Sequence, residues 1–161
     1  MISEFCVRSD SEEQTRTIAG TIARFFHSGD VIILDGDLGA GKTCFVKGFT
    51  EGVRARDPVN SPTFSIANFY RTDVTDILHI DLYRISTVDE FNDLGLHDYF
   101  EQSVVLIEWG KKFATSMEDY IIISLAINGD TTRTLTFTNQ CDKYESVMDE
   151  LKKILKGDIL C

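Results

Sequence analysis

The sequence predicts an α/β protein, a three-layer sandwich in which helices flank a mixed central sheet. An apolar run from Val31 to Leu34 is followed by a glycine-rich loop and then by apolar residues at helical spacing. Two further strand-like segments, 64–70 and 77–83, are separated by a short polar turn, which predicts an antiparallel hairpin. A second buried-strand run covers Val104 to Trp109. The chain has 161 residues, of which 43% are hydrophobic, and this suits a single domain over 1–161 with a substantial core.

The remaining elements follow from capping and periodicity. Ser11 with Gln14, and Thr87 with Glu90, form capping boxes that begin helices, and Gly29 is expected to end the first of them. The residues before Ser11 are polar and are assigned no element. The expected helices cover 11–27, 42 onward, 87–100 with a break near Gly95, and 142–156. In the last of these helices, the residues expected to point inward are Val147, Leu151, Ile154 and Leu155. The last two expected strands cover 120–127 and 133–138. Asp142 with Glu145 is expected to cap the final helix.

The glycine-rich loop carries the strongest chemical motif. Gly36, Gly41, Lys42 and Thr43 occupy the fixed positions of G-x-x-x-x-G-K-[ST] between a predicted strand and a predicted helix. Such a loop aims backbone N–H groups at phosphate oxygens, and the helix N-terminus adds a positive dipole end. Lys42 would contact the β- and γ-phosphates and Thr43 would bind Mg²⁺, so a nucleoside triphosphate with Mg²⁺ is implied.

Two carboxylates at strand ends are candidates for the same site. Glu108 follows the four apolar residues of the buried strand at 104–109, a position typical of a Mg²⁺ ligand, although an exposed strand end is the alternative. Asp81 shares one face of its strand with His79 and Tyr83, and such a polar face indicates either a site or a sheet edge facing water. Thr63, with Ser61, lies in the loop after the second helix, where it is either a γ-phosphate sensor or part of a polar turn.

Composition limits the classes of partner and compartment. The net charge of −10 argues against a protein that grips RNA or DNA alone. No apolar run is long enough to span a membrane and no signal peptide is evident, so a soluble cytoplasmic protein is expected. The four cysteines form no C-x-x-C pair, and reduced, incidental thiols are expected.

Two other classes of phosphate-loop protein fit the motifs less well. A GTPase is weakly suggested by Asn139–Asp142, which echoes N-K-x-D, but the lysine is missing and no D-x-x-G follows the loop. A small-molecule kinase would carry an arginine-rich lid, and Arg54 with Arg56 is the only close pair.

Four motifs, in this order and at this spacing, resemble the TsaE (YjeE) family of bacterial ATPases. They are GDLGAGKT at 36–43, SPTF at 61–64, HIDLYR at 79–84 and IEW at 107–109, and the resemblance runs from about Ser11 to Arg133.

The resemblance implies roles for individual residues. Leu38, Gly39, Ala40, Gly41, Lys42 and Thr43 would cradle the phosphates of ATP, and Thr43 and Glu108 would bind Mg²⁺. Asp81 would orient the attacking water or hold a Mg²⁺-bound water, and Thr63 would lie in a switch-like loop. Ser11 and Arg133 match positions beside the base and sugar. Trp109 follows the metal ligand as the family expects, or is a core aromatic.

The resemblance also implies a pathway. Family members help to form the threonylcarbamoyl group on the adenosine next to the anticodon of tRNA, acting with TsaD and TsaB. This chain would then hydrolyse ATP to reset that complex between turnovers, slowly alone and faster with its partners, and would meet tRNA only through them. The alternative is a binding module in which ATP only sets affinity for the partners.

Overall fold

The computed structural model of the chain describes residues 2–59 and 66–161. Its centre is a seven-stranded sheet in the order β1-β7-β6-β2-β5-β4-β3. The strands are β1 (Ser3–Ser9), β2 (Val31–Asp35), β3 (Ala67–Arg71), β4 (Asp76–Asp81), β5 (Ser103–Glu108), β6 (Ile121–Ile127) and β7 (Arg133–Asn139). The α-helices are α1 (Glu12–Ala23), α2 (Lys42–Gly52), α3 (Val88–Asp93) and α4 (Glu145–Ile154), and the longer 3₁₀ segments are η1 (Leu96–Gln102) and η2 (Lys111–Ser116).

The sheet is mixed, as the sequence predicts. β2 pairs in parallel with β5 and β6, and β4 pairs in parallel with β5. β3 and β4 form the expected antiparallel hairpin, and β7 pairs antiparallel with both β6 and β1. The predicted α/β fold with a mixed sheet flanked by helices is therefore confirmed.

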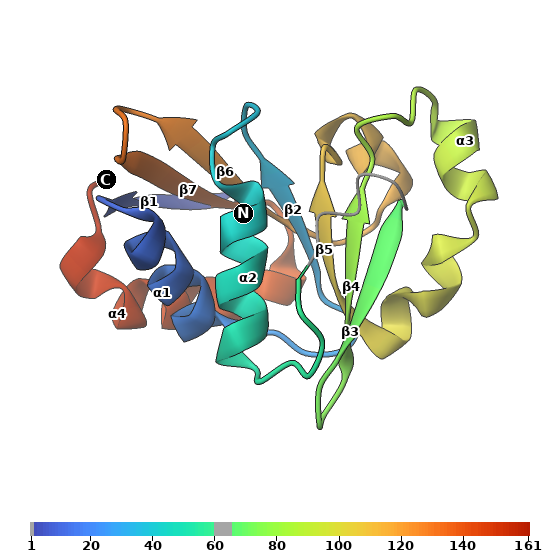
Figure 1. The fold of residues 1–161 in the computed structure, drawn as a ribbon, viewed down its shortest axis with the longest axis horizontal. Coiled ribbons are helices and arrows are strands. Elements are labelled where there is room, and N and C mark those ends of the chain that lie inside the picture. Colours follow the sequence, from blue (N-terminus) through green and yellow to red (C-terminus); the bar gives the residue numbers. More distant parts are fainter. Residues whose placement is uncertain (1, 60–65) are drawn as a thin grey trace.

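Two apolar clusters lie on the two faces of the sheet and make the three layers. On β5, Val104 and Leu106 belong to one cluster, whereas Val105 and Ile107 belong to the other. Because alternate residues of a strand point to opposite faces, the two clusters lie on opposite sides of the sheet. The first cluster includes residues of α1, α2 and α4, which lie together on one side in Figure 1. The second includes Phe91 of α3 together with Phe113 of η2.

Helices α1 and α2 pack at backbone distance through glycines. A Cβ placed on Gly48 would lie 2.2 Å from the carbonyl oxygen of Arg16, and one on Gly52 would lie 2.3 Å from that of Gly20. This contact sets the position of α2, whose first residue is Lys42.

Several local expectations were wrong. Helix α1 ends at Ala23 rather than near Gly29. Ile154 of α4 is 36% exposed, and Met148 is buried on that helix together with Leu151. A 3₁₀ turn at Asp142–Tyr144 precedes α4, so the N-cap residue of α4 is Tyr144 rather than the predicted Asp142.

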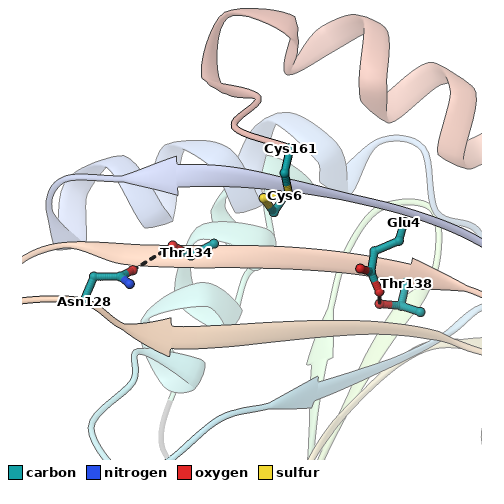
Figure 2. The surroundings of a disulfide bond; sticks show 6 residues. All are labelled: Glu4, Cys6, Asn128, Thr134, Thr138 and Cys161. Carbon is teal, nitrogen blue, oxygen red and sulfur yellow. Dashed lines mark hydrogen bonds between the residues drawn. A yellow bond between two sulfur atoms is a disulfide. The ribbon is translucent and has the colours of Figure 1, made fainter.

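Strand β1 and the chain's C-terminal end were not anticipated. Phe5 of β1 stacks on Phe137 of β7 with ring centroids 4.7 Å apart. The C-terminal residues lie along the outer edge of β1, where Val7 bridges to Ile159 and the N–H of Leu160 donates to the carbonyl of Cys6 at 2.8 Å. Cys6 and Cys161 form a disulfide with their Cα atoms 5.3 Å apart (Figure 2). The expectation of four incidental thiols was therefore wrong for this pair, while Cys44 and Cys141 are free.

Among the described residues, no helix combines the length and the apolar character that crossing a bilayer requires.

Candidate functional site

The glycine loop leads from the end of β2 into the first turn of α2. Gly41 caps α2 with φ of 107°, a conformation that L-residues with a side chain rarely adopt. Gly36 is required by space, because a Cβ there would lie 2.7 Å from the carbonyl oxygen of Leu125 on β6. Within residues 2–59 and 66–161, the N-cap of α2 has no side-chain hydrogen bond. Its first N–H groups therefore remain available to an anion.

Lys42, the first residue of α2, is buried with 5% of its surface exposed. Its Nζ donates to the carbonyl of Gly36 at 2.6 Å and lies 3.4 Å from the centre of the Trp109 ring. Burial lowers the pKa of Lys42, and the carboxylates of Glu108 and Asp81 oppose that shift. The ammonium is thus held inside the chain at a point where it faces two acidic side chains.

Asp81 and Glu108 are brought together by strand register. They end the neighbouring parallel strands β4 and β5 and are directly paired. Glu108 is 4% exposed, and its Oε2 lies 2.6 Å from Nε2 of His79. Asp81 is half-buried, and its Oδ1 accepts the N–H of Tyr83 at 2.9 Å. Burial, and to a lesser degree the charge of Glu108, raises the pKa of Asp81.

Trp109 follows Glu108 in a strained conformation. Its φ of 59° is rare for a bulky residue and places it among the backbone outliers that cluster at functional sites. The ring contacts both Lys42 and Tyr83, the latter with ring centroids 5.1 Å apart. The predicted sharing of one strand face by His79, Asp81 and Tyr83 is wrong for Tyr83, because β4 ends at Asp81 and Tyr83 is 64% exposed.

A cavity of about 540 Å³ unites most of the predicted site residues. Of the sequence-predicted residues, it is lined by Leu38, Gly39, Gly41, Lys42, Thr43, Asp81 and Glu108. Sequence reasoning did not place Glu12, Arg16, Lys47 or Ile66 in this site, although they also line it. Thr63 lies outside the described residues.

Ser11, Ala40 and Arg133 line a smaller cavity that shares Gly39 and Gly41 with the first one. Ser11 is engaged as the cap of α1, since its Oγ accepts the N–H of Gln14 at 3.0 Å. Arg133 donates to the carbonyls of Ala40 at 3.1 Å and Gly39 at 3.3 Å. The structure therefore gives both side chains a local role, one in holding α1 and the other in bracing the glycine loop.

The donor set of the larger cavity can be tested against Mg²⁺. Among residues 2–59 and 66–161, no group of three or more His, Cys, Asp or Glu side chains is placed to hold a metal ion by itself. The cavity does present hard oxygen donors, in Thr43, Asp81 and Glu108. Mg²⁺ in nucleotide sites usually takes one or two carboxylates together with substrate phosphates. These residues fit a Mg²⁺ ion that arrives with a nucleotide.

The sequence motifs did not predict the contact between His79 and Glu108. The sequence pattern placed His79 on the same face as Asp81, but its partner lies on another strand, 29 residues away. Only the register of β4 with β5 brings the two side chains together.

The fold and the loop define a class: α/β proteins in which a glycine loop joins a strand of a mixed sheet to a helix beside acidic strand ends. The family model described as "Threonylcarbamoyl adenosine biosynthesis protein TsaE" matches residues 9–135. The chain therefore belongs to the TsaE family.

Similar proteins agree over nearly the whole chain. The tRNA threonylcarbamoyladenosine biosynthesis protein TsaE of Bacillus subtilis (strain 168) is 42% identical over 148 residues, which cover 91% of this chain and 92% of that protein. The protein of the same name from Treponema pallidum (strain Nichols) is 35% identical, with 81% and 97% covered. A crystal structure of YdiB from Bacillus subtilis superposes with a TM-score of 0.79 at 35% identity, covering 96% of this chain and 97% of that one.

Proposed function

We propose that the 540 Å³ cavity binds ATP with Mg²⁺ and that the chain hydrolyses this ATP in the formation of threonylcarbamoyladenosine on tRNA. The observation that carries the proposal is the placement of Lys42, at the head of an uncapped helix, opposite the paired carboxylates of Asp81 and Glu108. Membership of the TsaE family supports the pathway.

The loop and Lys42 would bind the phosphates. Backbone N–H groups from Leu38 to Thr43 would surround the phosphate oxygens, and the N-terminus of α2 would add its dipole. The ammonium of Lys42 would exchange the Gly36 carbonyl for a β- or γ-phosphate oxygen, a stronger charge-assisted partner. Desolvation in the cavity strengthens that attraction, because the effective dielectric constant is low there.

Asp81 and Glu108 would divide two tasks between them. Glu108 and Thr43 would hold Mg²⁺, which would neutralise phosphate charge when bound. Asp81 would orient the attacking water, and two observations suit that role: its Oδ1 is anchored by the Tyr83 N–H, and burial raises its pKa above the usual value for an aspartate, which makes it a better proton acceptor.

Partners would complete the site. Among the described residues, the arginines that line the cavity are Arg16, which is paired with Glu51, and Arg84, which is exposed. An arginine fixed on the γ-phosphate can accelerate hydrolysis by about 10³–10⁵-fold. We therefore expect slow hydrolysis by the chain alone and faster hydrolysis with TsaD and TsaB, which would also hold the tRNA, since this chain carries a net charge of −10.

The same arrangement favours a second candidate, a module in which bound ATP sets affinity for the partners and turnover is incidental. Reconstituted tRNA modification with Lys42→Ala and Glu108→Ala separates the two. If hydrolysis matters, Glu108→Ala abolishes sustained modification while ATP-dependent assembly with the partners persists, and Lys42→Ala abolishes both. Modification that continues in Glu108→Ala without phosphate release would establish the module instead.

A further inference from the structure

A buried row of three polar side chains crosses neighbouring strands of the sheet and ends at Glu108, which lines the cavity. Tyr70, His79 and Glu108 come from the neighbouring strands β3, β4 and β5, and each is at most 4% exposed. Nδ1 of His79 lies 2.9 Å from the hydroxyl of Tyr70, and Nε2 lies 2.6 Å from Oε2 of Glu108. Burying polar groups in this way is unfavourable unless each is bonded, so the row must be held in one arrangement.

Sheet register places the row on one face. His79 lies two residues from Ile77, which is paired with Tyr70 across the β3–β4 hairpin. It also lies two residues from Asp81, which is paired with Glu108 across β4 and β5. Since side chains two residues apart share a face, the three polar groups point to the side on which α2 and the glycine loop lie.

The proton positions follow from the chemistry of the partners. A carboxylate only accepts hydrogen bonds, so Nε2 of His79 carries the proton donated to Glu108. When the ring is neutral, Nδ1 then accepts from the hydroxyl of Tyr70. Tyr70 thus selects the tautomer that donates to Glu108, and the His79 ring fixes one oxygen of that carboxylate.

We propose that His79, held by Tyr70, is a positioning residue that fixes Glu108 through Oε2 and leaves Oε1 to bind the divalent cation of a nucleotide. This inference rests on the proposed function, and it assigns His79 and Tyr70 to cation binding rather than to folding alone. Partners that orient a metal ligand in this manner typically change metal affinity by about 10–100-fold when they are removed.

Two substitutions of equal polarity give the decisive comparison. His79→Gln places an amide N–H₂ near the position of Nε2 and keeps a donor to Glu108. His79→Asn reaches only the position of Nδ1 and loses that donor. Binding of Mn²⁺ to the complex with AMP-PNP, a non-hydrolysable ATP analogue, is measured by electron paramagnetic resonance. AMP-PNP affinity in EDTA and the melting temperature are measured alongside.

We expect His79→Asn to weaken Mn²⁺ binding about 10-fold or more, and His79→Gln to stay within about 3-fold of the wild type. Affinity for AMP-PNP in EDTA should stay within about 2-fold in both variants, because Lys42 and the glycine loop are untouched. Equal effects of the two substitutions on Mn²⁺ binding, or no effect of either, would overturn the inference.

Tyr70→Phe tests the same inference if His79→Asn does not fold, because this substitution keeps the aromatic ring in the core and removes only the hydroxyl. We expect it to weaken Mn²⁺ binding about 3- to 10-fold, and unchanged binding would overturn the inference. A wild-type chain that binds no AMP-PNP would refute the proposed function itself. Tight wild-type binding of AMP-PNP and Mn²⁺ with unaffected variants would refute only the role of His79.

Discussion

Replacing Gly48 with alanine tests whether the stability of the fold and the position of α2 depend on the close contact between α1 and α2. The new Cβ would lie 2.2 Å from the carbonyl oxygen of Arg16, 2.5 Å from its Cα and 2.7 Å from its carbonyl carbon. All three atoms belong to the backbone of α1, so no side chain can rotate away. Carbon–carbon contacts need about 3.5 Å or more, so the 2.5 Å approach to the Arg16 Cα would require the two helices to separate by roughly 1 Å.

The expected loss of stability follows from that displacement. Overpacking typically costs about 1–3 kcal/mol, and a clash with backbone places Gly48→Ala at the upper end, near 3 kcal/mol. For a chain of this size each kcal/mol shifts the melting temperature by about 2–4 °C, so a fall of about 6–12 °C is expected. Because α2 begins at Lys42, affinity for ATP should fall as well.

Urea denaturation and calorimetry measure the effect, with Gly157→Ala as the matched control. A Cβ on Gly157 meets nothing within 4 Å, and this residue is not among the glycines of positive φ. The control should change stability by less than about 1 kcal/mol. Gly48→Ala with the wild-type melting temperature would refute the packing argument.

Three further predictions concern the edges of the site and the fold. Cys161→Ser should lower the free energy of unfolding by about 2–4 kcal/mol under non-reducing conditions, and dithiothreitol should affect the wild type but not the variant. Arg133→Ala should lower it by about 1–2 kcal/mol and loosen the glycine loop, and Arg133→Lys, which cannot make the same fork of bonds, should behave similarly in urea denaturation. Hydrogen bonds from Arg71 lower the pKa of Asp57 to about 2, so its stabilising effect is complete above the unfolded pKa of about 3.9 and is lost as the pH falls through about 2. Carboxyl NMR should show that pKa moving toward 4 in Arg71→Gln, and a wild-type value already near 4 would contradict it.

Local patterns predicted the part of the fold that local interactions determine. The apolar run of β2, the glycine loop and the amphipathic start of α2 are adjacent in sequence, so periodicity and motif spacing reveal them together. The β3–β4 hairpin and the Thr87 cap are also short-range, and the Thr87 hydroxyl does accept the N–H of Glu90.

The features of the fold that the sequence did not predict depend mainly on pairings between distant parts of the chain. β1 is stabilised by β7, some 130 residues away, and its edge is covered by the C-terminal residues, whose Cys161 lies 155 residues from Cys6. No local pattern reports such a pairing. Helix α1 ends at Ala23 although apolar residues continue, and Phe26, which follows the helix, packs into the core.

In the candidate site too, sequence motifs predicted some residues, whereas other contacts depend on long-range structure. Motif positions gave the residues of the loop and the two strand-end carboxylates, which the fold brings to one cavity. The bonds from His79 to Glu108 and from Arg133 to the loop depend on strand register, which spacing along the chain does not reveal.

Phosphate release from Mg-ATP measures directly whether the chain hydrolyses ATP and whether its partners stimulate it. It is measured for the full chain alone, with the TsaD–TsaB pair, and for Lys42→Ala under both conditions, with folding checked by melting temperature. We expect slow release by the wild type, clear stimulation by the pair and loss of both in Lys42→Ala. Release that is absent from the wild type in both conditions, or that persists in Lys42→Ala, would contradict this expectation.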